Sequence, residues 1–248
     1  MAGVTHNNIW IVTGTCRCGT GTFSKALGIH HEYRLASLKT IESWQSSLSK
    51  EYPFKNYENK QKLASFLYDS IDQNRDFGDS NNQTIHCLDA IYELYPWTKF
   101  IYLVRNGKDW TTSALHRGYD QRNTFSTSPG TSDKIYSEWL QMSPISKCAW
   151  IWSNRNKIGI NNLSKIPDTN KMIIKIEDCQ KRNETQMAHK IENFLGFQIK
   201  NKKALWNKNN SDHLKNELYQ NNWTPSQHHD FNKYGQKMMI KLGYEIGN

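Results

Sequence analysis

The amino-acid sequence predicts an α/β fold in which a central parallel β-sheet lies between two layers of flanking helices. Apolar runs at residues 9–12 and 100–104 have the length and composition of strands that are buried on both faces. Segments with helical periodicity separate such runs, as expected for successive β-α-β units. A glycine-rich loop at residues 13–22 joins the first apolar run to the first helical segment, so that backbone N–H groups converge at a helix N-terminus.

Each element follows from local pattern. Strands are expected at 8–13, 99–104 and 171–176, where β-branched and aromatic residues cluster. A shorter strand is expected at 76–79 or at 84–87, and the pattern leaves both possibilities open. Helices are expected where apolar residues recur three or four positions apart, at 20–28, 58–73, 88–95, 108–116, 134–141, 145–164, 185–195 and 226–241. The length of 248 residues suffices for one core, so residues 1–248 are predicted to form a single domain.

The charge balance favours an anionic ligand. Lys and Arg outnumber Asp and Glu by 32 to 23, which gives a formal net charge of +9. Such a balance also permits nucleic-acid binding, but the lysines are scattered, and the sequence has no RNA-binding aromatic signature and no zinc-finger spacing. We therefore expect no nucleic-acid partner.

Compartment and metal content follow from what the sequence contains. It has no secretory signal and no apolar run long enough to span a bilayer, so we expect a cytoplasmic protein without stable membrane insertion. Five cysteines, an odd number, agree with a reducing compartment. Cys16 and Cys18 form a C-x-C pair, but no second ligand pair lies nearby, so no metal site is expected.

The loop at 13–22 nearly fits a phosphate-binding P-loop. Gly14 and Gly19 have the G-x-x-x-x-G spacing, whereas Thr20 and Gly21 replace the Lys and Ser/Thr that contact the terminal phosphates and Mg²⁺. Arg17 lies within the loop instead, and its planar guanidinium suits bidentate contacts to an oxyanion. The loop therefore predicts a P-loop NTPase-like fold that binds a nucleotide phosphate without a metal. The alternative is an ordinary glycine-rich turn with one exposed arginine.

A second segment strengthens the phosphate-binding interpretation. The expected strand at 99–104 ends in Arg105-Asn106-Gly107-Lys108-Asp109, and the helix that follows contains Ser113. Two parallel strands thus each deliver an arginine at the carboxyl edge of the sheet, where ligands of open α/β sheets bind.

Together these motifs resemble those of sulfotransferases that use 3′-phosphoadenosine 5′-phosphosulfate (PAPS). The family's 5′-phosphosulfate loop, [K/R]-x-G-T-x-x, matches Arg17, Cys18, Gly19, Thr20, Gly21 and Thr22. Its 3′-phosphate motif, R-[ND]-x-[KR]-D with a serine eight residues after the arginine, matches Arg105 and Ser113. The resemblance implies transfer of a sulfuryl group from PAPS to a hydroxyl, leaving 3′,5′-bisphosphoadenosine (PAP).

Departures from the family pattern indicate which branch of the family the chain resembles. Thr22 stands where the cytosolic phenol and steroid enzymes stack adenine on a tryptophan, and the R-K-G segment of that branch is missing near the C-terminus. The chain is therefore more similar to bacterial enzymes that sulfate carbohydrates or lipids. The implied acceptor is a glycan, a glycolipid or a small natural product. Two alternatives are a P-loop-type nucleotide kinase or phosphotransferase and a non-catalytic nucleotide-binding module.

Sulfuryl transfer needs positive charge at the leaving oxygen and a base for the acceptor proton. Arg17 is expected to supply the charge. Glu32 is favoured as the base, because related carbohydrate sulfotransferases carry a Glu in a comparable stretch, with His31 as the second candidate. Asp79 is a third candidate, whereas His30 has the character of a polar helix end and His86 only roughly matches the region of the cytosolic branch's base.

Two further features have less specific interpretations. Residues 117–133 lack periodicity and are rich in Gly, Ser and Thr, which is typical of either a lid over the acceptor or simple disorder. Trp44 and Trp139 fall in variable segments and are weak candidates for acceptor contacts, because most tryptophans are expected to pack in the core.

Overall fold

The computed structural model describes residues 8–32, 53–68, 71, 75–122, 124, 127–180, 184–206 and 222–246. The chain divides into two compact units, each built from three chain segments. The first unit comprises Met1–Ala36, Asn56–Val104 and Gly159–Asn209, and the second comprises Ser37–Lys55, Arg105–Ile158 and Asn210–Asn248. The single domain expected from the sequence stays a prediction.

The first unit contains a five-stranded sheet in the order β2-β3-β1-β4-β5, and every neighbouring pair is parallel. The strands are β1 (Ile9–Gly14), β2 (His30–His31), β3 (Phe77–Ser80), β4 (Lys99–Val104) and β5 (Lys171–Lys175). Three predicted strands are confirmed, and the shorter one is β3. The alternative at 84–87 is wrong, because that region lies largely in the 3₁₀ helix η2 (Asn82–His86). The two-residue strand β2 was not predicted.

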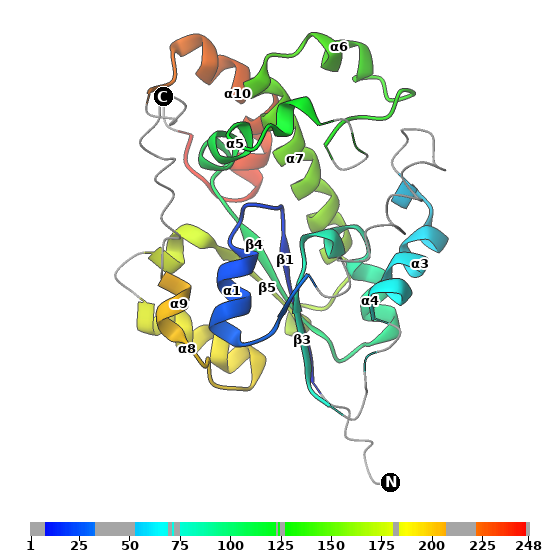
Figure 1. Cartoon of the computed structure of the whole chain (residues 1–248), viewed down its shortest axis with the longest axis vertical. Coiled ribbons are helices and arrows are strands. Elements are labelled where there is room, and N and C mark those ends of the chain that lie inside the picture. Colours follow the sequence, from blue (N-terminus) through cyan, green and yellow to red (C-terminus); the bar gives the residue numbers. More distant parts are fainter. Residues whose placement is uncertain are drawn as a thin grey trace. The chain divides into compact units, whose positions relative to one another are not determined.

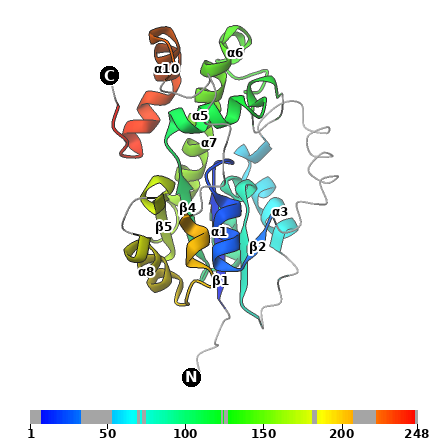
Figure 2. The ribbon, with the colours of Figure 1, turned by 60° about the vertical axis from the view of Figure 1, so that its left-hand side comes forward.

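Helices cover both faces of this sheet, which confirms the three-layer α/β fold. Figure 1 shows α1, α8 and α9 on one face and α3 and α4 on the other, and Figure 2 shows α9 beside α1. Their bounds are α1 (Thr20–Leu27), α3 (Tyr57–Tyr68), α4 (Leu88–Leu94), α8 (Glu184–Leu195) and α9 (Lys202–Trp206). The unit also contains η4 (Asp168–Asn170), η5 (Ile176–Gln180) and, from Gly159 onward, the end of α7 (Pro144–Leu163).

Alternation along the strands divides the apolar side chains between the two faces. Trp10 and Val12 of β1 belong to one buried cluster with Phe23 and Leu27 of α1 and with Ile191 of α8. Both faces of the central strands are buried, which explains why their sequences are continuous apolar runs.

The second unit is helical. It contains η1 (Pro53–Lys55), α5 (Gly107–Leu115), η3 (Tyr119–Gln121), α6 (Tyr136–Gln141), α7 as far as Ile158, and α10 (Pro225–Lys241). A capping box defines the start of α10, because the Thr224 side chain accepts from the Gln227 N–H while the Gln227 side chain accepts from the Thr224 N–H. Tilted ring contacts join Trp152 of α7 and Trp223 to Phe231 of α10. None of the helices in the described ranges is both long and apolar enough to cross a membrane.

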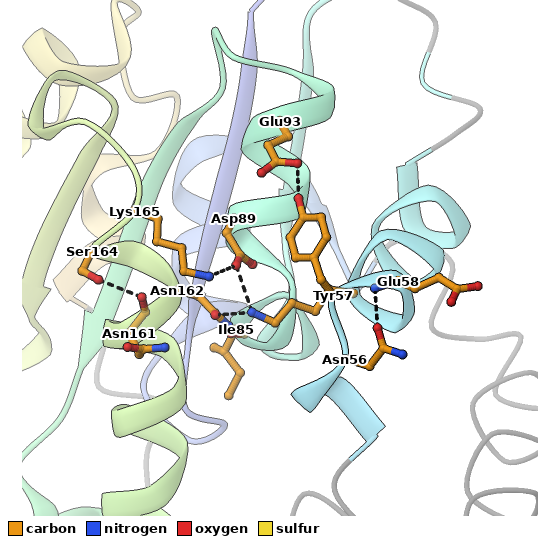
Figure 3. Close-up of polar contacts among 11 residues, drawn as sticks. Asn56, Tyr57, Glu58, Ile85, Asp89, Glu93, Asn161, Asn162, Ser164 and Lys165 are labelled. Atoms are coloured by element: carbon orange, nitrogen blue, oxygen red, sulfur yellow. Dashed lines mark hydrogen bonds and ion pairs between the residues drawn. The ribbon is translucent and has the colours of Figure 1, made fainter.

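A buried charged cluster ties three helices of the first unit together (Figure 3). Lys60 Nζ of α3 lies 2.9 Å from Asp89 Oδ2 of α4 and 2.7 Å from Asn162 Oδ1 of α7. Lys165 Nζ lies 2.6 Å from the same Asp89 oxygen, and Asn162 Nδ2 donates to the Ile85 carbonyl of η2 at 2.8 Å. The cluster, defined as Lys60, Asp89, Asn162 and Lys165, was not predicted from the sequence.

Candidate functional site

Two glycines shape the loop between β1 and α1. Gly14 has φ +152°, and a Cβ there would overlap the Leu103 carbonyl oxygen of β4. Gly19 has φ +96°, and a Cβ there would lie 2.9 Å from Ile176 Cδ1. The loop therefore approaches the sheet more closely than a larger residue permits. Gly19 is also the N-cap of α1 and contributes no side-chain cap, so the first N–H groups of the helix point toward the loop.

Arg17 is held in an unusual backbone conformation. Its φ of +65° lies in the left-handed region, which costs a non-glycine residue roughly 1–2 kcal/mol. Arg17 is exposed, whereas its neighbours Cys16 and Cys18 are buried. The buried neighbours anchor the loop, and the strained residue between them is the one that carries a charge. Strain at an exposed charged residue is typical of functional loops.

The two histidines of β2 lie on opposite faces of the sheet. Helix α1 ends at the left-handed Gly28, as expected, but His30 and His31 form a strand and do not belong to a polar helix end. The His31 ring lies against the start of α1, with Nε2 3.4 Å from the position of a Cβ on Gly21. His30 stacks on Phe77 with ring centroids 5.4 Å apart. Of the two histidines, His31 is thus the one whose ring lies near the loop at 13–22.

Glu32 follows β2 directly and is held by contacts with two residues at and just after the end of β3, Ser80 and Asn82. Its φ is +55°, and its N–H donates to the Ser80 carbonyl at 3.0 Å. Its Oε1 accepts a hydrogen bond from Asn82 Nδ2 at 3.0 Å, and the residue is half-buried. Ser80 in turn donates from Oγ to the Thr20 carbonyl of α1 at 2.8 Å. These contacts place Glu32 and the first turn of α1 against the same end of β3.

Asp79, the third candidate for the base, is fully buried and faces α3. The Tyr68 hydroxyl donates to Asp79 Oδ2 at 3.0 Å. Burial, together with the nearby Asp79 carboxylate, raises the pKa of the Tyr68 phenol well above its usual value. Ser80, the next residue, bonds to α1 on the other face, so Asp79 points away from the phosphate loop. His86 is fully buried as well. Both positions therefore have a packing explanation.

The second motif forms a tight turn into α5. Asn106 Oδ1 accepts from the N–H groups of Lys108, at 2.9 Å, and Asp109, at 3.4 Å, which is an N-cap. Trp152 Nε1 donates to the Arg105 carbonyl at 3.2 Å. Ser113 lies in the middle of α5, and both Arg105 and Ser113 are half-buried. The turn thus gives Asn106 a structural role as the N-cap of α5.

The segment at 117–133 is folded by its own contacts where the structure describes it. The Arg122 guanidinium lies 4.1 Å from the Tyr119 ring centroid, and Ser128 donates from Oγ to the Thr124 carbonyl at 2.9 Å. Its role as a lid stays a prediction. Trp139 is buried against Trp150, with ring centroids 5.1 Å apart, which favours packing over acceptor contact. Trp44 lies outside the described residues.

The described ranges contain no group of three or more His, Cys, Asp or Glu side chains that could hold a metal ion. All five cysteines are buried thiols that take part in no disulfide. Burial also raises the pKa of the Cys179 thiol to about 12, with smaller contributions from Asp178 and Glu177, so this thiol stays protonated at neutral pH.

Solved structures share this fold over nearly the whole chain. A sulfotransferase domain from the curacin biosynthetic pathway has a TM-score of 0.57 at 13% identity, covering 97% of this chain and 99% of its own. The sulfotransferase domain of the Synechococcus PCC 7002 olefin synthase has a TM-score of 0.56 at 15% identity, covering 100% and 98%. Mouse sulfotransferase SULT7A1, solved in complex with PAP, has a TM-score of 0.51 at 16% identity, covering 94% and 85%.

Sequence comparison identifies the family independently. No curated protein gives a significant match to the chain. A family model described as "Sulfotransferase domain", however, matches residues 10–165, which is more than half of the sequence and includes the phosphate loop, Glu32 and the turn at Arg105. The chain therefore belongs to the sulfotransferase domain family and is a sulfotransferase enzyme.

Proposed function

We propose that this enzyme transfers the sulfuryl group of PAPS to a hydroxyl of a carbohydrate, a glycolipid or a small natural product. The observation that carries the proposal is the loop at 13–22, which presents a strained, exposed Arg17 just before the uncapped N-terminus of α1. Convergent N–H groups, a helix dipole and a guanidinium together suit the 5′-phosphosulfate. A +9 chain also suits a donor with several negative charges.

The proposed chemistry is a direct displacement at sulfur. The acceptor oxygen forms a bond to sulfur while the bond from sulfur to the 5′-phosphate oxygen breaks, and its electron pair stays on the departing PAP. Negative charge therefore develops on the phosphate oxygen, where Arg17 and the N–H groups of residues 18–22 stabilise it. The acceptor proton passes to the Glu32 carboxylate, with His31 as the alternative recipient.

Separate variants of Glu32 and His31 test the base. Glu32→Gln keeps the shape of the side chain but cannot accept the proton, so kcat is expected to fall by about 100- to 10,000-fold with little change in PAP affinity. His31→Ala is expected to have a smaller effect, through positioning. Steady-state kinetics give kcat for each variant, and direct binding measurements give its affinity for PAP. An active Glu32→Gln enzyme beside an inactive His31→Ala enzyme would assign the base to His31.

The turn at Arg105 is proposed to bind the 3′-phosphate. Arg105→Ala and Ser113→Ala are expected to weaken PAP binding, by about 1.5–3 kcal/mol for the arginine, because a charge-assisted hydrogen bond is lost. Calorimetric titration with PAP and with adenosine 5′-phosphate measures this loss. Arg117→Ala, which removes an exposed arginine of the same unit, is the matched control and should bind PAP normally. Equal affinity of the wild type for the two nucleotides would contradict the assignment.

Acceptor class is tested with labelled donor. The enzyme is incubated with ³⁵S-labelled PAPS and fractions of carbohydrate, glycolipid and small-molecule extracts, and label transfer is followed together with PAP formation. Incorporation into a hydroxyl-bearing fraction, abolished in the Arg17→Ala enzyme, is the expected result. PAP binding without label transfer to any fraction would instead support the alternative of a non-catalytic nucleotide-binding module.

A further inference from the structure

The short 3₁₀ helix η2 (Asn82–His86) lies directly after β3, and its first residue contacts Glu32. Asn82 Nδ2 donates to Glu32 Oε1 at 3.0 Å. The backbone of Glu32 is held at the same time, because its N–H donates to the Ser80 carbonyl at 3.0 Å. Glu32 is thus held both at its backbone and at one carboxylate oxygen, which leaves its side chain few orientations.

The turn that carries Asn82 is itself anchored at both ends. Asn81 caps it, accepting from the Gln83 N–H at 3.0 Å, and the Asn81 N–H donates to the Val12 carbonyl of β1 at 2.9 Å. At the other end, Asn162 Nδ2 donates to the Ile85 carbonyl at 2.8 Å. Asn162 in turn accepts a hydrogen bond at Oδ1 from the buried Lys60 Nζ. Asn82 therefore projects from a backbone segment that is fixed to the sheet and to the buried charged cluster.

We propose that Asn82 is a positioning residue, which orients the Glu32 carboxylate for proton abstraction. This inference rests on the proposed function, since it assumes that Glu32 is the base. A neutral amide is suited to the task because it donates a hydrogen bond to the carboxylate without neutralising it, as a lysine or arginine would. A misplaced base loses catalytic efficiency steeply, so the contact matters for turnover and not for donor binding.

Single variants test the need for a donor at this position. Asn82→Ala is expected to lower kcat about 10- to 100-fold with an unchanged KM for PAPS. Asn82→Asp keeps the size of the side chain but replaces the donor with a second carboxylate, so its loss of kcat at pH 8 should be at least as large. Gln83→Ala, the matched control in the same turn, should retain wild-type activity. Wild-type activity of Asn82→Asp would overturn the proposal.

A double-mutant cycle separates positioning from general damage to the fold. Glu32→Asp keeps a carboxylate but shortens it by one methylene, which withdraws it from the Asn82 amide. In the Glu32→Asp enzyme, Asn82→Ala should then lower kcat by less than about twofold, because the effects of interacting residues are not additive. An equal loss in both backgrounds would overturn the positioning role even with Glu32→Gln inactive. An active Glu32→Gln enzyme would instead reject the base itself, and with it this inference.

Discussion

Replacing Arg17 by alanine is expected to lower kcat for sulfuryl transfer by about 100- to 1000-fold while PAPS affinity changes far less. In the proposed mechanism the guanidinium contacts an oxygen whose charge grows as the bond to sulfur breaks, so its contribution should be larger in the transition state than in the bound ground state. Rapid-mixing or steady-state kinetics, together with a separate measurement of PAPS affinity, distinguish a loss of kcat from a loss of donor binding. A large loss of affinity with unchanged kcat would contradict this role.

Two companion variants separate the charge of Arg17 from its backbone strain. Arg17→Gly removes the charge but suits the left-handed φ of +65°, so the variant should be inactive and at least as resistant to thermal unfolding as the wild type. Arg17→Lys keeps the charge without the planar fork and should retain partial activity. Loss of activity accompanied by loss of stability in Arg17→Gly would indicate a structural role for the loop instead.

Replacing Lys60 by methionine is expected to lower the free energy of unfolding by about 3 kcal/mol or more. Asp89 is only 3% exposed, and Lys60 is its buried partner, whereas the other partner, Lys165, is about half exposed. Without Lys60, the ion pair with Lys165 is the one that Asp89 keeps among the described residues, and water competes for this exposed lysine. Asn162 also loses the contact to its Oδ1, which weakens the link from α3 to α7.

The same helix supplies the control for this experiment. Lys62 forms an exposed i,i+4 pair with Glu58 at 2.8 Å, and Lys62→Met should change the free energy of unfolding by no more than about 0.5 kcal/mol. Urea denaturation followed by circular dichroism gives both values. If Lys60→Met and Lys62→Met had equal effects, the cluster would carry no special stability. A Lys60→Met/Asp89→Leu double variant should recover part of the loss, because no uncompensated charge stays buried.

Local pattern in the sequence was enough to locate most of the fold. The runs at 9–12 and 100–104 became central strands, because a strand that is buried on both faces accommodates consecutive apolar residues. Predicted and observed bounds of α1, α4, α5 and α10 agree within one residue, since periodicity and capping act over a single turn. The helix expected at 58–73 is described as far as Tyr68, and the five-residue α9 was too short to give a periodic signal.

The sequence also predicted the elements that we propose for donor recognition. The spacing of Gly14, Arg17 and Gly19 predicts a phosphate-binding loop, and the structure shows close backbone approach at both glycines, where a larger residue does not fit. Only the tertiary structure decided which candidate bases face this loop. Asp79 turned toward Tyr68, His31 came to lie at Gly21, and Glu32 met Asn82 fifty positions along the chain. Such pairings depend on strand register and on which face of the sheet each residue occupies, and no local pattern encodes contacts over that separation.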